Sequence, residues 1–160
     1  MIDEEIRAVV LAVIVLGAAL AVSQAITAGR VAEPFSALGV LGPNMKIGDY
    51  PKEVLAGEPF RLYLYVENHE GKAMYYRVLE KVGDNSTVLN ETVPADLPVL
   101  ASYDVVLAHG ENATIPVNVT LATPAQGAKL IFELWAVGTG GSPYYTGRWN
   151  HLWINVTSPP

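Results

Sequence analysis

The chain has 160 residues, of which 51% are hydrophobic and 16% are charged, so it can fill a core and is not a disordered tail. Its formal net charge is −6 and its ten Lys and Arg are scattered, which argues against nucleic acid as a partner. It has no cysteine, which excludes disulfides, thiolate nucleophiles, Cys-ligated zinc and iron–sulfur clusters.

The first predicted element is a membrane-spanning helix. Residues Ala8–Ala28 carry no charge, and as a helix they extend about 31 Å at about 1.5 Å per residue, which matches a hydrocarbon core of about 30 Å. We assign residues 8–30 to this span and residues 1–7 to a cytoplasmic segment. A cleaved signal peptide and a buried helix of a soluble protein are the alternatives, but the three acids at residues 3–5 differ from the basic n-region of a signal peptide.

One stripe of this helix consists of small residues. Gly17, Ala21 and Ala25 follow one another at intervals of four, which lets another helix approach closely in lipid. The alternative is that Ala and Gly are simply common in this chain. We therefore expect membrane lipid, and a partner helix on this stripe, as neighbours of the span.

The rest of the chain is predicted to be an external β domain, with a linker and first strand over residues 31–58 and the remainder over residues 59–160. Apolar and polar residues alternate in Phe60–Glu67 and in Asn112–Leu121, as in half-buried strands. Pro116 cannot donate to a ladder and predicts an edge strand or a bulge. Further strands are predicted over Ala37–Leu41, Ala73–Lys81, Thr87–Val93, Val99–Ala108, Lys129–Val137 and Arg148–Val156.

Short strands at this spacing, without helices between them, predict an all-β fold: an antiparallel immunoglobulin-like β-sandwich preceded by one N-terminal transmembrane α-helix.

Five N-x-[S/T] tripeptides lie in the second half of the chain, where random placement would give less than one. They predict N-linked glycans on an exported surface. Because glycan is added outside the cell, the N-terminus should be cytoplasmic and the domain extracellular. Sequons without any cysteine favour an archaeal surface protein. The predicted glycosylation sites are Asn85, Asn90, Asn112, Asn118 and Asn155.

Several segments together resemble a known family. These are Glu33–Asn44, Asp49–Pro51, Gly57–Pro59, Val66–Gly71 and His151–Thr157. Their order resembles the DUF1616 family of archaeal membrane proteins over about residues 33–157. The resemblance implies a membrane-attached, externally facing β domain and no enzyme activity. Family members often have more membrane helices than this chain, so it stays open whether the chain borrows helices from partners.

No catalytic or metal-binding pattern is found. His69 and His109 lie in predicted turns and His151 in the last strand, without H-x-x-H or H-x-H spacing. For His69 we expect a ring that hydrogen-bonds the backbone. We expect no metal, no cofactor and no enzyme activity, and we interpret the scattered acids as solvated surface charge. These acids are Glu67, Glu70, Asp84, Glu91, Asp96, Asp104, Glu111 and Glu133.

Aromatic residues near the C-terminus predict an interaction surface. In the last strand Trp149, His151 and Trp153 should point outward, opposite to Leu152 and Ile154. Trp135 has the same parity as Glu133, and Tyr144 and Tyr145 lie in the preceding loop. The alternative is a one-residue error in parity, or a bulge near Gly147, that places the tryptophans in the core. The predicted surface comprises Trp135, Tyr144, Tyr145, Trp149 and Trp153.

These features predict a non-enzymatic, single-pass surface glycoprotein that acts as a structural or interaction subunit of a membrane or envelope assembly. A pilin-like filament subunit is one alternative, although no leader peptide with a processing site precedes the helix. An accessory subunit of a membrane enzyme or secretion complex is the other. Its expected partners are other subunits, N-linked glycans and lipid.

Overall fold

The computed structural model describes residues 3–30 and 32–160. The chain divides into an N-terminal unit that ends at Glu33 and a C-terminal unit, Pro34–Pro160. Residues 1 and 2 of the expected cytoplasmic segment and residue 31 of the expected linker lie outside the described residues.

The N-terminal unit contains one long helix, α1 (Glu4–Ala28), among its described residues. It begins four residues before the expected span, because Glu4 and Glu5 suit the positive end of the helix dipole and continue the helix outward. It ends before Gly29, two residues short of residue 30. Every described side chain of α1 is exposed, and the helix is long and apolar enough to be a candidate membrane span.

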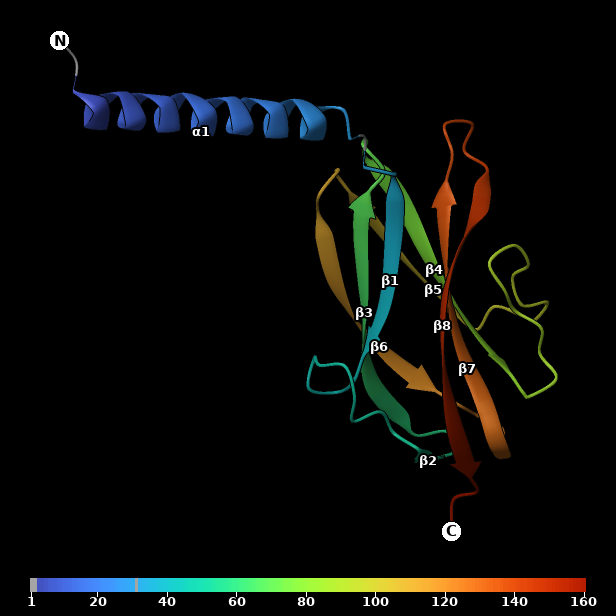
Figure 1. Ribbon diagram of the computed structural model, residues 1–160. Helices are drawn as coiled ribbons and strands as arrows, with labels where there is room; N and C mark the ends of the chain where they lie inside the picture. Colours follow the sequence, from blue (N-terminus) through green and yellow to red (C-terminus); the bar gives the residue numbers. More distant parts are fainter. Residues whose placement is uncertain (1–2, 31) are drawn as a thin grey trace. The chain divides into compact units, whose positions relative to one another are not determined.

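The C-terminal unit consists of two packed sheets (Figure 1). The three-stranded sheet has the order β1–β3–β6, with bounds Phe35–Leu41, Pro59–His69 and Asn112–Thr120. The five-stranded sheet has the order β2–β8–β7–β4–β5, with bounds Glu53–Leu55, Pro143–Thr157, Ala125–Val137, Met74–Gly83 and Ala101–Leu107.

The strand order makes this an immunoglobulin-like sandwich. The first, third and sixth strands form one sheet, and the fourth, seventh and eighth form the centre of the other, as in immunoglobulin domains. All pairs are antiparallel except one: β2 pairs with β8 in parallel. The predicted all-β sandwich after an apolar helix is therefore confirmed. The parallel pair was not predicted, and its strand β2 lies within the expected linker segment.

The core lies between the sheets and is built by alternating side chains. Leu62, Leu64 and Val66 of β3 are fully buried and face Leu130, Phe132 and their neighbours on the other sheet. The largest fully buried side chain, Tyr76, shares a hydrogen bond of 2.7 Å between its hydroxyl and that of Ser36, which joins the two sheets. Pro116 lies on β6 at the edge of its sheet, as its missing N–H predicts.

The segment predicted as a strand over Thr87–Val93 is instead part of a long loop. This β4–β5 loop (residues 84–100) forms no regular ladder. Asp84 and Asn90 accept backbone N–H groups from two or three residues ahead, at 2.8 to 2.9 Å, and these local bonds compete with strand pairing. In Figure 1 the loop (yellow-green) lies beside β7 and β8, away from β1, β3 and β6.

Candidate interaction surface

The outer face of the five-stranded sheet, opposite to the core, carries most of the predicted surface residues. Central strand β7 is buried on both of its sides: Phe132 and Leu134 pack in the core, whereas Ile131 and Glu133 are buried outside it. The β4–β5 loop covers Glu133 there, since Ala95 of the loop donates its N–H to the Glu133 carboxylate. Strand β8 adds Trp149, His151 and Trp153 to the same outer face, because these residues alternate with the buried Ile154 and Val156.

A buried ion pair fixes the loop to this face. Lys81 of β4 and Glu133 of β7 are 5% and 0% exposed, and Lys81 Nζ lies 2.8 Å from Glu133 Oε2. The same two side chains bind the backbone of Ala95: Lys81 Nζ donates to its carbonyl at 2.7 Å, and its N–H donates to Glu133 Oε1 at 2.6 Å. Each charge is therefore paired and hydrogen-bonded, as burial requires.

Trp135 and Tyr145 extend this cluster. The indole N–H of Trp135 donates to Glu133 Oε2 at 3.1 Å, and its ring centroid lies 5.6 Å from that of Tyr145. The Tyr145 hydroxyl donates to the Asn90 carbonyl at 2.9 Å, so it holds the loop a second time. Burial, and then the nearby Glu133 carboxylate, raise the pKa of Tyr145 to about 12, so this hydroxyl stays protonated.

The second aromatic group, here called the aromatic row, is Trp149, His151 and Trp153. The rings of Trp149 and His151 stack with centroids 5.5 Å apart, and Trp153 meets His151 edge-on at 5.6 Å. Lys129 Nζ lies over the Trp153 ring at 5.6 Å from its centroid. Burial, and then the charge of Lys129, lower the pKa of His151, which keeps it neutral at pH 7.

Tyr144 lies apart from the other predicted surface residues. It pairs with Ala136, whose side chain is in the core, whereas Tyr145 pairs with Trp135 on the outer face. Tyr144 is 46% exposed and lies near Gly138 at the end of the β7–β8 hairpin. Both tyrosines belong to β8 and not to the preceding loop, since β8 begins at Pro143.

The bulge considered near Gly147 exists, and it does not turn the tryptophans into the core. The pairs Leu134↔Arg148 and Trp135↔Tyr145 leave Thr146 and Gly147 as two extra residues in β8. Two residues preserve the alternation of a strand, so Tyr145 and Trp149 share a face. Gly147 has a φ of +77°, and a Cβ there would lie 2.5 Å from the Glu91 carbonyl oxygen.

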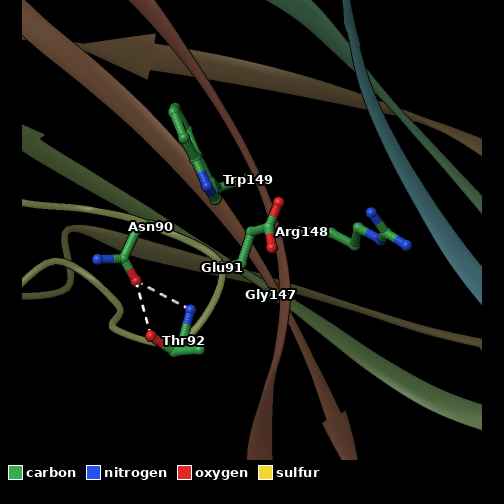
Figure 2. A pocket seen from close by; sticks show the side chains of 6 residues that line it. All are labelled: Asn90, Glu91, Thr92, Gly147, Arg148 and Trp149. Carbon is green, nitrogen blue, oxygen red and sulfur yellow. Dashed lines mark hydrogen bonds between the residues drawn. The ribbon is translucent and has the colours of Figure 1, made fainter.

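A groove of about 590 Å³ opens between the β4–β5 loop and the start of the aromatic row. Gly147 lets the two approach closely. In the view of Figure 2 the Glu91 carboxylate is drawn between the Trp149 ring and the Arg148 side chain, whose guanidinium points away from Glu91. The residues that line the groove are Asn90, Glu91, Thr92, Gly147, Arg148 and Trp149.

The sequon asparagines lie in three places. Asn85 and Asn90 are exposed in the β4–β5 loop, and Asn112 and Asn118 are exposed on β6. Asn155 is half-buried on β8, and its Oδ1 accepts the Gly127 N–H at 2.8 Å. Four of the five sites therefore present an accessible side chain.

The histidines form no metal site among residues 3–30 and 32–160, where no group of three His, Cys, Asp or Glu is arranged to hold an ion. His69 ends β3 and contacts Glu67 Oε1 at 2.7 Å, so the expected backbone bond of this ring is wrong. Bonds from His69 and then Tyr65 lower the pKa of Glu67. His109 Nδ1 accepts the Gly71 N–H at 3.0 Å, and its ring meets His69 edge-on.

Sequence reasoning missed the buried Lys81 and Glu133. The interpretation of Glu133 as solvated surface charge is wrong, because the loop covers the outer face at this point. The run Leu130-Ile131-Phe132 could have indicated this burial, because consecutive apolar residues are typical of a strand that is buried on both sides.

The molecule is thus an immunoglobulin-like β-sandwich with a partly covered outer face, joined to an apolar helix. Its sequence matches the profile of DUF1616, a domain of unknown function, over residues 30–155, and the chain belongs to this family. A search of the curated proteins finds no significant match.

Among solved structures, the chain is similar to the CARDB domain of a Pyrococcus furiosus protein, solved in complex with di-metal ions. The TM-score is 0.48 at 11% identity, over 78% of this chain and 89% of that one. A beta-glucosidase from Listeria innocua gives 0.48 at 14% identity, over 79% of this chain and 16% of the other. The sporulation control protein Spo0M from Bacillus subtilis gives 0.44 at 13% identity, over 76% and 49%.

Proposed function

We propose that this chain is a non-enzymatic, membrane-anchored surface glycoprotein that acts as an interaction subunit of a membrane or cell-envelope assembly. The observation that carries the proposal is the aromatic row. Trp153 is 48% exposed beside Trp149 and His151 on a sheet face, and large aromatic side chains in such positions are enriched where proteins bind one another.

The position of the aromatic row supports a role in an interface and not in core packing. Trp149 and Trp153 are on the outer face: Trp149 is half-buried and lines the open groove, and Trp153 is exposed, whereas Glu133 is buried beneath the loop. Exposed apolar patches on a protein surface are typical of sites that contact a partner.

The apolar helix supports the membrane anchor. In α1, Gly17 has no atom within 4 Å of its Cβ position, so the stripe of Gly17, Ala21 and Ala25 is available to a helix of another subunit. We assign the segment before α1 to the cytoplasm and the sandwich to the outside of an archaeal cell, since the sequons require export.

The exposed sequons support a glycosylated surface. Asn112 and Asn118 project from β6, on the other sheet, so glycans there would leave the aromatic row uncovered, whereas Asn90 lines the groove beside Trp149. The partner then meets the sandwich at the row, and glycan on β6 covers the opposite sheet.

Site-specific photocrosslinking in the native membrane tests the proposal. A photoreactive phenylalanine at Trp153 should capture a protein partner, and the same residue at Tyr63, on the outer side of the other sheet, should not. Equal capture from both positions, or none from either, would contradict an interface at the row. A ladder of the chain itself would assign the face to a filament.

A further inference from the structure

We infer that the groove between the β4–β5 loop and Trp149 receives a cationic side chain, a guanidinium or an ammonium group, from a basic segment of the partner protein. The inference rests on the proposed function, because it names the chemistry by which the partner is recognised. It is argued from the groups in the groove that make no hydrogen bond, from their charge, and from the contact of Lys129 with Trp153 on the same strand.

Most polar groups of the groove are already occupied. Asn90 Oδ1 accepts three hydrogen bonds at 2.9 Å, from the N–H and hydroxyl of Thr92 and from the N–H of Val93. The Asn90 carbonyl accepts a hydrogen bond from the Tyr145 hydroxyl. The groups that stay available include the ring of Trp149, the carboxylate of Glu91 and the side-chain amide N–H groups of Asn90.

Glu91 is an uncompensated charge within the described chain. The ion pairs of residues 3–30 and 32–160 join His69 to Glu67, Arg77 to Asp104 and Lys81 to Glu133, and none includes Glu91. Arg148 is a basic residue that lines the groove, and its guanidinium points away from Glu91 (Figure 2). The β4–β5 loop also contains Asp84 and Asp96 and no Lys or Arg, so its potential attracts a cation.

An aromatic face beside a carboxylate is the pairing that cations prefer. The ring quadrupole attracts a cation within about 6 Å of the centroid, and a carboxylate adds a charge-assisted hydrogen bond. The aromatic row already contains one such contact, since Lys129 Nζ lies 5.6 Å from the Trp153 centroid. Trp149 lines the groove, one of its ring faces stacks on His151, and no cation of residues 3–30 and 32–160 lies over its ring.

The shape agrees with a side chain from outside. The groove volume of about 590 Å³ is within the range of about 300–1,000 Å³ for ligand sites, and Gly147 forms part of its wall without a side chain. A saccharide would also stack on Trp149, and the test below distinguishes it from a cation.

The test uses the full chain in lipid nanodiscs and a short capped peptide with two arginines, titrated while the indole N–H signal of Trp149 is followed by NMR. An otherwise identical peptide with citrulline in place of arginine keeps the shape and removes the charge. We expect a saturable shift with the arginine peptide and a dissociation constant at least tenfold weaker with citrulline.

Two substitutions with the same change of charge localise the site. Glu91→Gln should weaken binding of the arginine peptide about tenfold, whereas Asp96→Asn, in the same loop and outside the groove, should change it less than twofold. Trp149→Leu, followed through the backbone N–H signals of residues 84–100, should abolish binding while the signals of the core stay in place. Both Glu91→Gln and Trp149→Leu keep the Asn90 sequon intact.

Equal binding of both peptides, or equal effects of Glu91→Gln and Asp96→Asn, would overturn the inference. A Trp149 shift with maltotriose and none with the arginine peptide would overturn it in favour of a saccharide site. Failure here leaves the proposed function standing if Trp153 still captures a partner in the membrane. Arginine binding without any captured partner would instead remove the proposed function and keep the groove chemistry.

Discussion

Nζ of Lys81 lies 2.8 Å from Oε2 of Glu133, and both side chains are buried beneath the β4–β5 loop. The backbone N–H and carbonyl of Ala95 complete this pair, so a loop without regular structure is held by two charges from adjacent strands. The position of that loop shapes the groove beside Trp149. A stability feature of the sandwich and the geometry of its candidate interface are therefore linked.

Breaking this ion pair should destabilise the sandwich strongly. Glu133→Gln leaves Lys81 charged and buried without its partner, which costs on the order of 3–5 kcal/mol. Replacing both residues, as Lys81→Met with Glu133→Leu, should cost less than Glu133→Gln alone, because no uncompensated charge remains. Chemical unfolding of the full chain in nanodiscs, followed by tryptophan fluorescence, measures the free energy of unfolding.

The exposed pair of Arg77 and Asp104 on the same sheet provides the control. Their side chains are 42% and 38% exposed, so solvent screens the charges. Asp104→Asn should change the unfolding midpoint little. If it destabilises the fold as much as Glu133→Gln does, burial of the Lys81–Glu133 pair is not what makes it strong.

Gly147→Ala should displace the loop from β8. A Cβ would lie 2.5 Å from the Glu91 carbonyl oxygen, and φ at this residue is +77°, which alone costs about 1–2 kcal/mol for a residue with a side chain. We expect a lower free energy of unfolding and faster proteolysis within residues 84–100. Gly140→Ala in the β7–β8 hairpin has no neighbour within 4 Å and should be close to wild type in both assays.

The aromatic row should have a pH-dependent stability through His151. Burial and the charge of Lys129 lower the pKa of His151 below its usual 6.5, so the unfolded chain binds the proton more tightly. Its contribution is fully present above pH 6.5 and is lost as the pH falls through the lowered value. NMR titration of the imidazole should give a midpoint below 6.5, and Lys129→Met should move it part of the way back. A midpoint at or above 6.5 would contradict this environment.

Sequon occupancy should differ between the asparagines. Asn112 and Asn118 are exposed on β6, whereas Asn155 is half-buried with its Oδ1 bound to the Gly127 N–H. We expect higher glycan occupancy at the two β6 sites than at Asn155, as measured by glycopeptide mass spectrometry of protein from its own membrane. Full occupancy at Asn155 would show that this part of β8 is modified before it pairs with β7.

The strands with regular alternation could be predicted from sequence. In β3 and β6 the apolar residues that face the core recur at every second position, so Phe60–Glu67 and Asn112–Leu121 identify both strands. In β8 the same alternation separates Ile154 from Trp153. One-sided burial gives a period-two pattern, and such strands need no tertiary information.

The loop and the parts it covers could not be predicted in this way. Val88 and Leu89 resemble strand residues, but the local turn at Asn90 and the bonds to Glu133 and Tyr145 decide their conformation. Strand β2 has three residues and is stabilised by β8, about a hundred residues further along the chain. The Lys81–Glu133 pair likewise joins residues that local patterns do not relate.

The central claim is that this chain works as a subunit of a larger assembly. The measurement that tests it most directly is the size and composition of the native particle, solubilised gently from its own membrane, by electron microscopy with mass spectrometry of the same fraction. We predict constant co-purification of another protein, which is lost with Trp153→Ala. A lone glycosylated monomer in its micelle would contradict the account.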